Sequence, residues 1–320
     1  MISDTKEGYV FNSYGKSKYL RDAVVALESI RRYDKFRMAA LYCCKTHLQL
    51  LKELNLESHF DIVEELEPEN QSITGFKHNI HKFMPFDKNL YLDSDMVLCK
   101  NPDRLWQSLS PYGYTATGQD SADVFFGATK GFGVLLDIFF RKRQRTLKRF
   151  QLSHLYRIQS GLIFTQDREL AEKVDTLATE YLNAKGETHF VSRKNEKGRS
   201  LESCEWSIAM AMTKLQLYVY PWFNGYESPQ LDYISGFTIH DDDFKNVKCL
   251  YFSNPFVYSL RGLKAGFARS FFLSIFELFP RGKDHMHVTP YFLHFGWKHE
   301  KSLHDAFAKK RWDEIVGSRA

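Results

Sequence analysis

The first third of the chain alternates between short apolar segments and longer segments whose apolar residues recur three or four positions apart. That spacing is typical of one face of an α-helix. The pattern predicts strands at 8–13, 37–43 and 60–66, separated by helices at 19–32 and 47–56. Alternation of this kind predicts parallel strands, with helices covering both faces of the sheet. Ligands of such sheets bind beyond the carboxyl ends of the strands.

Composition limits the classes of protein that this sheet can belong to. With 320 residues, 43% of them hydrophobic and 27 of them Phe, the chain can bury a large aromatic core. It has no run of 18 apolar residues, and its first seven residues lack the apolar core of a secretory signal, so we expect a cytoplasmic protein. A net charge of +5 does not indicate a nucleic-acid partner. Five cysteines without zinc-type spacing predict free thiols: Cys43, Cys44, Cys99, Cys204 and Cys249.

The segment Tyr91–Leu98 carries the most specific chemical signal. Asp93 and Asp95 are separated only by Ser94 and follow an apolar strand. Residues two apart at a strand end point to the same side of the pleat. Two such carboxylates are suitable ligands for a hard divalent cation, which usually completes its shell with substrate phosphates. A pair of solvated acids at a strand end is the alternative interpretation.

The sequence on both sides of this pair extends the motif. A basic, helix-compatible segment, Gly75–Pro85, precedes it, and Asn101–Trp106 forms a turn into a new helix. This region, about 70–110, resembles the Asp-x-Asp region of GT-A glycosyltransferases, especially family 8, the glycogenin and galactosyltransferase-like group. The resemblance implies a GT-A fold: a Rossmann-like mixed sheet flanked by helices. We expect one domain over 1–320, comprising a nucleotide-binding half (1–110), a sugar and acceptor half (111–300) and a C-terminal tail (301–320).

The resemblance also implies a ligand set. In family 8, the two acids, here Asp93 and Asp95, hold Mn²⁺ (or Mg²⁺) against the diphosphate of a nucleotide-sugar, which we expect to be a UDP-sugar. A C-terminal His-x-x-Gly-x-x-Lys motif supplies the third metal ligand and a lysine for the diphosphate. Here the motif is contracted, with His294, Gly296 and Lys298 two residues apart. His294 and Lys298 take these roles in our prediction, and His285, His287 and His299 are the alternatives for the histidine.

Other positions follow from the same likeness. Gln159, in the Gln-Ser-Gly segment at 159–161, stands where the family has an asparagine that contacts the donor sugar. Glu205, with Glu202 as its rival, opens a helix whose acidic residue lies beside the transferred sugar in the family. An acidic residue at a helix start also stabilises the helix through its dipole. Lys77 is expected to face the nucleotide. We also assign nucleotide contacts to Ser94, and to Asn12 and Tyr14 in the turn after the first strand.

Three further segments carry alternatives. The acidic run His240–Asp243 is a second candidate metal site, but polar residues follow it, so we predict a solvated turn. The basic residues of 139–150 are either a solvated helix or, with Phe139, Phe140 and Phe150, a contact with an anionic membrane at the inner membrane face. The aromatic segment 267–279 is predicted to pack in the core, with membrane contact as the alternative. The polar segment 189–200 is predicted to be a mobile loop.

These observations predict transfer of a hexose from a nucleotide-sugar to a glycan or lipid-linked acceptor, with retention of anomeric configuration if the family likeness holds. A nucleotidyltransferase that makes nucleotide-sugars is the alternative enzyme. It would need a glycine-rich phosphate loop, and segment 12–17 contains one glycine. A non-catalytic module that binds carbohydrate or lipid is the alternative from another class, because fold likeness alone does not fix function.

Overall fold

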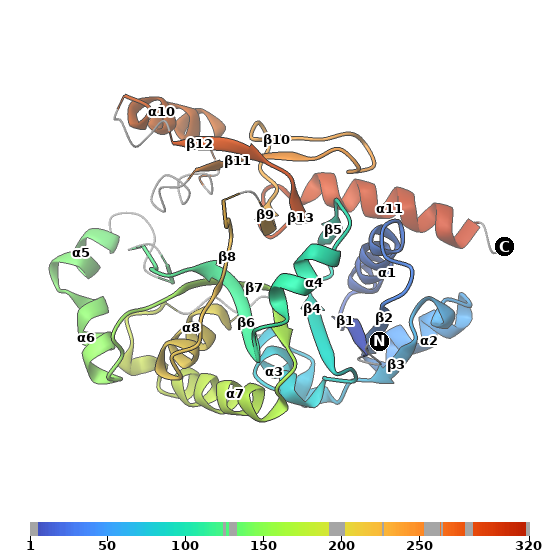
Figure 1. Cartoon of the computed structure of the whole chain (residues 1–320), viewed down its shortest axis with the longest axis horizontal. Coiled ribbons are helices and arrows are strands. Elements are labelled where there is room, and N and C mark those ends of the chain that lie inside the picture. The colour runs from blue at the N-terminus through green and yellow to red at the C-terminus, as the bar shows by residue number, and fades with distance from the viewer. Residues whose placement is uncertain are drawn as a thin grey trace.

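A seven-stranded mixed sheet forms the centre of the molecule (Figure 1), with strand order β3-β2-β1-β4-β7-β6-β8. The computed structural model describes residues 6–123, 126–127, 133–191, 202–225, 227–252, 263, 265–278 and 284–317. The sheet strands are β1 (Glu7–Ser13), β2 (Met38–Cys43), β3 (Ile62–Glu65), β4 (Lys88–Leu92), β6 (Tyr114–Gln119), β7 (Arg157–Thr165) and β8 (Tyr220–Pro221). The prediction of a mixed α/β sheet flanked by helices is confirmed.

The two halves of this sheet differ in strand direction. β1 pairs in parallel with β2 and β4, and β2 pairs in parallel with β3, as the helix–strand alternation predicts. β7 instead runs antiparallel to both of its neighbours, β4 and β6. Leu92 at the end of β4 therefore lies opposite Leu162, near the middle of β7. The backbone NH of Asp93, the next residue, donates to the Gly161 carbonyl over 2.8 Å, which fixes the start of the Asp-Ser-Asp segment against β7.

Helices cover both faces because the strand side chains alternate in direction. Leu90 and Leu92 pack in one apolar cluster with α1 (Lys18–Arg31), α2 (Lys45–Glu53) and α4 (Asp103–Leu109). Tyr91, between them, belongs to the cluster on the other face, with α3 (Ile73–Lys77), α7 (Arg168–Asn183) and α8 (Glu205–Lys214). Side-chain caps fix two of these helix starts: Ser72 accepts from Gly75 in α3, and Asp167 accepts from Leu170 in α7.

A second, three-stranded sheet brings the C-terminal part of the chain back to the end of β4. β13 (Pro290–His294) lies between β5 (Met96–Leu98), to which it is antiparallel, and β9 (Ser228–Asp232), to which it is parallel. The register places His294 opposite Met96 on one side and Asp232 on the other. After β13, helix α11 (Lys301–Gly317) runs beside α1 (Figure 1).

A third sheet and a helix lie at the top of Figure 1. The sheet contains β10 (Thr238–Ile239), β11 (Lys248–Phe252) and β12 (His285–Val288), and the helix is α10 (Gly266–Phe276). The prediction that segment 267–279 packs in the core is wrong for most of its described residues. Leu273 is buried, but Phe267 is 83% exposed and Phe271 54% exposed. Leu273 packs in a small cluster with Phe252 of β11, and Phe279 lies outside the described residues.

The basic segment forms two short helices, α5 (Gly133–Phe139) and α6 (Lys142–Arg149). Single 3₁₀ turns occur at Glu57–His59, Pro68–Asn70, Ile80–Lys82 and Lys185–Glu187. All five cysteines are buried free thiols, as predicted. Among the described residues, no helix is both long enough and apolar enough to cross a membrane. The predicted loop 189–200 lies outside the described residues from position 192 onward.

Candidate metal centre

Asp93, Asp95 and His294 converge at the carboxyl end of β4. One side-chain ligand atom of each lies within 4.8 Å of the others. His294 Nε2 is 3.5 Å from Asp95 Oδ1 and 4.0 Å from Asp93 Oδ2. The pairing of β13 with β5 brings the histidine next to acids 200 positions earlier in the chain. The Phe295 NH donates to the Asp95 carbonyl over 3.0 Å, which holds the two segments together just beyond the paired strands.

Asp93 is held by a buried cation and a buried phenol. Lys77 Nζ lies 2.8 Å from Asp93 Oδ1 and donates to the Ser160 carbonyl over 2.8 Å. The Tyr91 hydroxyl is 2.7 Å from the same Asp93 oxygen and 3.1 Å from Asn12 Oδ1. Burial opposes a charge on Lys77, but the Asp93 carboxylate outweighs it and raises the pKa of the lysine. Asp93 is therefore oriented before any ligand binds.

Asp95 has a different cationic partner, Lys301, at the start of α11. The Lys301 ammonium lies 2.7 Å from Asp95 Oδ2. Burial would raise the pKa of Asp95, but Lys301 and His294 hold it well below its usual range. Asp95 is thus charged at neutral pH, which is the form that binds a metal ion.

His294 is oriented by a third carboxylate. Its Nδ1 is 2.7 Å from Asp232 Oδ1, while the other Asp232 oxygen accepts from the Trp297 indole NH over 2.9 Å. Burial would lower the pKa of His294, but hydrogen bonds to Asp232 and Asp95 raise it to about 10. A carboxylate behind a ligating histidine fixes the ring orientation and makes the ligand nitrogen more basic. Nε2 therefore faces the two aspartates.

The backbone of Gly161 lies close against these ligands. A Cβ placed on Gly161 would come 3.4 Å from His294 Nε2, 3.5 Å from Asp93 Oδ2 and 3.1 Å from Gln230 Oε1. The amide oxygens of Gln230 and Gln159 are buried, and neither has a hydrogen-bond partner among the described residues. The Gln159 amide nitrogen already donates to Asp232 over 2.5 Å. Unpaired buried acceptors of this kind are rare and need an explanation, such as a ligand that donates to them.

The other predicted residues lie around this centre at different depths. Asn12 contacts the centre only indirectly in the described residues, by accepting a hydrogen bond from the Tyr91 hydroxyl. Tyr14 is buried in the adjoining apolar cluster. Ser94 is partly exposed between the two acids. Glu205 is the first residue of α8, and it adds to the effect of Asp93, which raises the pKa of Lys77 against the opposing effect of burial. Its rival Glu202 instead forms an ion pair with Lys185.

The alternative histidine ligands do not belong to the cluster. Lys298 is exposed in the turn before α11, and Lys301, three residues later, contacts Asp95. His285 and His287 are exposed on β12, and His299 lies 3.8 Å from Glu300. The rival run His240–Asp243 forms a turn in which Asp241 accepts from the Lys245 and Asn246 backbone, as predicted.

Four residues of the centre were missed by sequence reasoning: Lys301, Asp232, Trp297 and Gln230. Asp232 and Gln230 lie on β9, and their place depends on the pairing of β9 with β13. Trp297 lies inside the His294–Lys298 segment, and Lys301 lies three residues beyond it, so a wider window around that segment would have included Lys301.

Comparison with known proteins gives distant structural similarities only. No protein-family model and no curated protein matches the chain. Among solved structures, the galactosyltransferase LgtC in complex with donor and acceptor sugar analogues is 13% identical, with a TM-score of 0.49 over 97% of this chain and 95% of that one. Mouse xyloside xylosyltransferase 1 is 14% identical, with a TM-score of 0.46 over 70% of this chain and 87% of that one.

The glycosyltransferase GlyE of Streptococcus pneumoniae TIGR4 is 16% identical, with a TM-score of 0.49 over 98% of this chain and 63% of that one. These identities and scores are too low to carry a function from one protein to another. The function of this chain is therefore argued from the side chains of the site.

Proposed function

We propose that this chain is a metal-dependent glycosyltransferase of the GT-A type, resembling family 8, which transfers a hexose from a UDP-sugar to a glycan or lipid-linked acceptor. The observation that carries the proposal is the convergence of Asp93, Asp95 and His294 within 4.8 Å. This convergence joins a local Asp-x-Asp pair to a histidine 199 positions beyond Asp95. The alternative of two solvated strand-end acids does not account for a buried histidine facing both carboxylates.

The donor atoms fit a divalent ion. Two carboxylates and one imidazole are a suitable set for Mn²⁺ (or Mg²⁺ with the carboxylates). A bound divalent cation would act as a Lewis acid on the diphosphate oxygens, where negative charge grows as the sugar leaves. The chain's own contribution is to hold Asp93 through Lys77 and Tyr91, and to orient His294 through Asp232.

Lysines supply the remaining positive charge for the leaving group. Lys298 keeps its predicted role toward the diphosphate as part of this proposal, and Lys301 is a second candidate because it already contacts Asp95. An ammonium aimed at the leaving oxygens stabilises the charge that develops there. Lys77 is buried against Asp93 and adds its positive charge to the same side of the site.

The sugar is assigned to the side of the centre that carries unpaired acceptors. The Gln159 and Gln230 amide oxygens suit donation from sugar hydroxyls, and Glu205 at the start of α8 lies on the Lys77 side. Asn12, Tyr14 and Ser94 are left for the nucleoside. No described side chain is an obvious nucleophile toward the sugar, so retention of configuration rests on the family 8 resemblance.

A screen of donors tests this proposal. Purified protein is incubated with UDP-, GDP- and CMP-sugars, with Mn²⁺ or with a chelator, and release of nucleoside diphosphate is measured. We expect release from a UDP-sugar only when Mn²⁺ is present, and loss of that release in Asp95→Asn. Formation of a nucleotide-sugar from a sugar phosphate and UTP would favour the nucleotidyltransferase. The absence of any nucleotide binding would favour the non-catalytic module.

We also propose that segment 139–150 contacts an anionic membrane, where a lipid-linked acceptor would be found, with the protein peripheral at the inner membrane face. Phe139 is 78% exposed and Phe140 48% exposed, beside the exposed cations Arg141, Arg145 and Lys148. Basic residues near an anionic surface contribute about 1 kcal/mol each. The predicted insertion of Phe150 is wrong, because its ring packs edge-on against Tyr181 with the centroids 5.3 Å apart.

The structure also indicates which charges to remove. Lys142 is paired with Asp137, and Arg143 donates to the Ala122 carbonyl, so both are poor probes of lipid binding. We expect Arg141→Gln, Arg145→Gln and Lys148→Gln together to weaken binding to phosphatidylserine vesicles by roughly 100-fold in sedimentation assays. The matched control removes three exposed lysines elsewhere: Lys35, Lys45 and Lys52. Equal binding of the two triple variants would remove the membrane proposal.

A further inference from the structure

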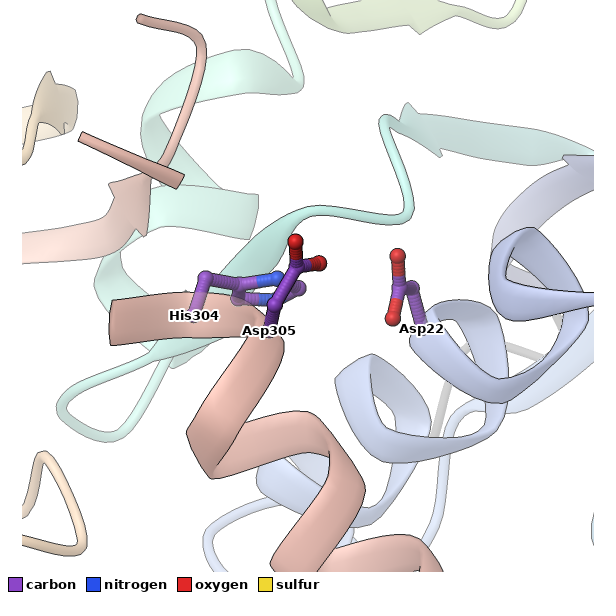
Figure 2. Close-up of side chains that lie close together, drawn as sticks. All are labelled: Asp22, His304 and Asp305. Carbon is purple, nitrogen blue, oxygen red and sulfur yellow. The ribbon is translucent and has the colours of Figure 1, made fainter. Parts of the chain in front are cut away.

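A second cluster of metal-ligand type joins α1 to α11 (Figure 2). Asp22 comes from α1, and His304 and Asp305 come from the first turns of α11. One ligand atom of each lies within 4.8 Å of the others. Asp22 and His304 are buried, with 4% and 1% of their surfaces exposed, and the Asp305 side chain is 43% exposed. None of these residues was singled out from the sequence.

Ion pairs satisfy only part of this cluster. Arg21 donates from Nε and Nη2 to Asp22 Oδ1, over 3.0 and 2.9 Å. Its Nη2 is also 3.4 Å from Asp305 Oδ1, and Lys18 Nζ is 3.7 Å from the same oxygen. All of these contacts use the Oδ1 atoms. Within the described part of the chain, the Oδ2 atoms of both aspartates have no hydrogen bond and remain available as ligands.

The surroundings of His304 are a further reason to consider a metal site. Its ring packs against Phe295, with centroids 4.9 Å apart, but neither ring nitrogen makes a hydrogen bond within the described residues. Figure 2 shows the ring extending from α11 toward Asp22. A buried imidazole that faces two carboxylates is a donor set for a divalent cation.

We propose that Asp22, His304 and Asp305 bind a second divalent cation of the zinc class. One imidazole and two carboxylates are common ligands of Zn²⁺, and water can fill the fourth position because Asp305 is partly exposed. The ion satisfies the His304 nitrogen and the free carboxylate oxygens together. It also ties the start of α11 to α1.

The position of this cluster gives the ion a structural role. Lys301 lies one helical turn before His304 and Asp305 on α11, and it is the residue that contacts Asp95. An ion that fixes this turn also fixes the Lys301 ammonium beside the first cluster. This cluster shares no ligand residue with the first one, so its metal binding can be measured without an assay of sugar transfer.

Metal counting tests the proposal directly. The full-length chain is dialysed against Zn²⁺ and bound zinc is measured by elemental analysis, in parallel with the visible absorption of added Co²⁺. The first cluster is removed by Asp93→Asn with Asp95→Asn. We expect this background to keep one equivalent of Zn²⁺, and His304→Phe or Asp305→Asn in it to weaken binding at least tenfold. His287→Phe, an exposed histidine on β12, is the control and should change nothing.

Two results would overturn the assignment. One is a background variant that binds no zinc, and the other is zinc binding that neither His304→Phe nor Asp305→Asn weakens. Because His304 is buried, its variant is checked for folding by circular dichroism. If it is unfolded, Asp305→Asn decides the question, since that side chain is partly exposed.

Discussion

The described part of the chain contains two clusters of two aspartates and one histidine, and their surroundings differ. In the first, both carboxylates and the ring of His294 have protein partners, namely Lys77, Lys301 and Asp232. In the second, His304 is buried without any hydrogen bond in the described residues. The same donor set is thus oriented by protein groups in one place and left incomplete in the other.

This difference separates a candidate reaction site from a candidate structural site. The first cluster adjoins Gly161 and the unpaired amide oxygens of Gln159 and Gln230, which are acceptors for a larger ligand. The second lies at the contact between two helices, where an ion is the ligand that fits best. The two clusters have the same kinds of ligand, so it is their neighbouring groups that distinguish the candidate reaction site from the candidate structural site.

The largest expected effect is that of Asp95→Asn on turnover. Loss of a charged ligand removes several kcal/mol of stabilisation from the leaving diphosphate, so Mn²⁺-dependent release of UDP should fall about 10³-fold. Asp242→Asn, from the exposed acidic turn, is the matched control and should retain activity. Equal activity in the two variants would mean that the first cluster is not the reaction site.

Asp232→Asn tests whether the carboxylate behind His294 matters for metal binding. Removing such a partner of a ligating histidine typically costs 10–100-fold in metal affinity. Asparagine can still accept from Trp297, so the fold should be kept. The measurement is a Mn²⁺ titration followed by electron paramagnetic resonance. An unchanged affinity would show that the orientation of His294 does not depend on Asp232.

A third buried histidine gives a reference for His304. Burial lowers the pKa of His78 to about 4, but its ring, unlike that of His304, has a hydrogen-bond partner, Ser207, at 2.9 Å. Because the folded pKa lies below the unfolded value of 6.5, the unfolded state binds more protons between pH 6.5 and 4, and stability falls as the pH falls. From pH 7 to pH 5, His78 should cost about 2 kcal/mol of unfolding free energy.

Urea unfolding at both pH values measures this cost. His78→Gln should reduce the loss of stability between pH 7 and pH 5 by that amount, and the exposed His287→Gln should leave it unchanged. If His78→Gln has the same pH dependence as the native sequence, then His78 is not held neutral by burial.

The smallest expected effect separates two lysines. Lys301→Met removes the ammonium on Asp95 and should lower kcat/KM about tenfold, as expected for a hydrogen bond between charged groups. Lys298→Met removes an exposed lysine three positions earlier and should have a smaller effect if Lys301 is the one that meets the diphosphate. A larger loss in Lys298→Met would instead support Lys298, the residue predicted from the sequence, as the lysine that contacts the diphosphate.

Local sequence patterns predicted the parts of the fold and site that depend on local structure. The helix–strand alternation gave the parallel half of the sheet. Asp93 and Asp95 do lie close together, but in the turn between β4 and β5 and not on a strand pleat as the i, i+2 spacing predicted. The position of His294 came only from the family resemblance, because strand pairing over some 200 residues brings it to the acids. Asp232 could not be predicted for the same reason, since it depends on the pairing of β9 with β13.

Surface and core were harder to distinguish than strand and helix. The aromatic residues of α10 recur as they would in a buried helix, yet Phe267 and Phe271 are exposed. Periodicity reports which residues share a face, and it does not report whether another element covers that face. The cluster of Asp22, His304 and Asp305 was missed because two helices distant in sequence contribute to it.

The most direct test of the account is a calorimetric titration of the protein with UDP, in the presence and absence of Mn²⁺. We predict that UDP binds with micromolar affinity only when Mn²⁺ is present, and that Asp95→Asn abolishes this binding while Asp242→Asn does not. UDP binding that is equally tight in EDTA, or that survives in Asp95→Asn, would contradict the assignment of the first cluster to a metal-bound sugar donor.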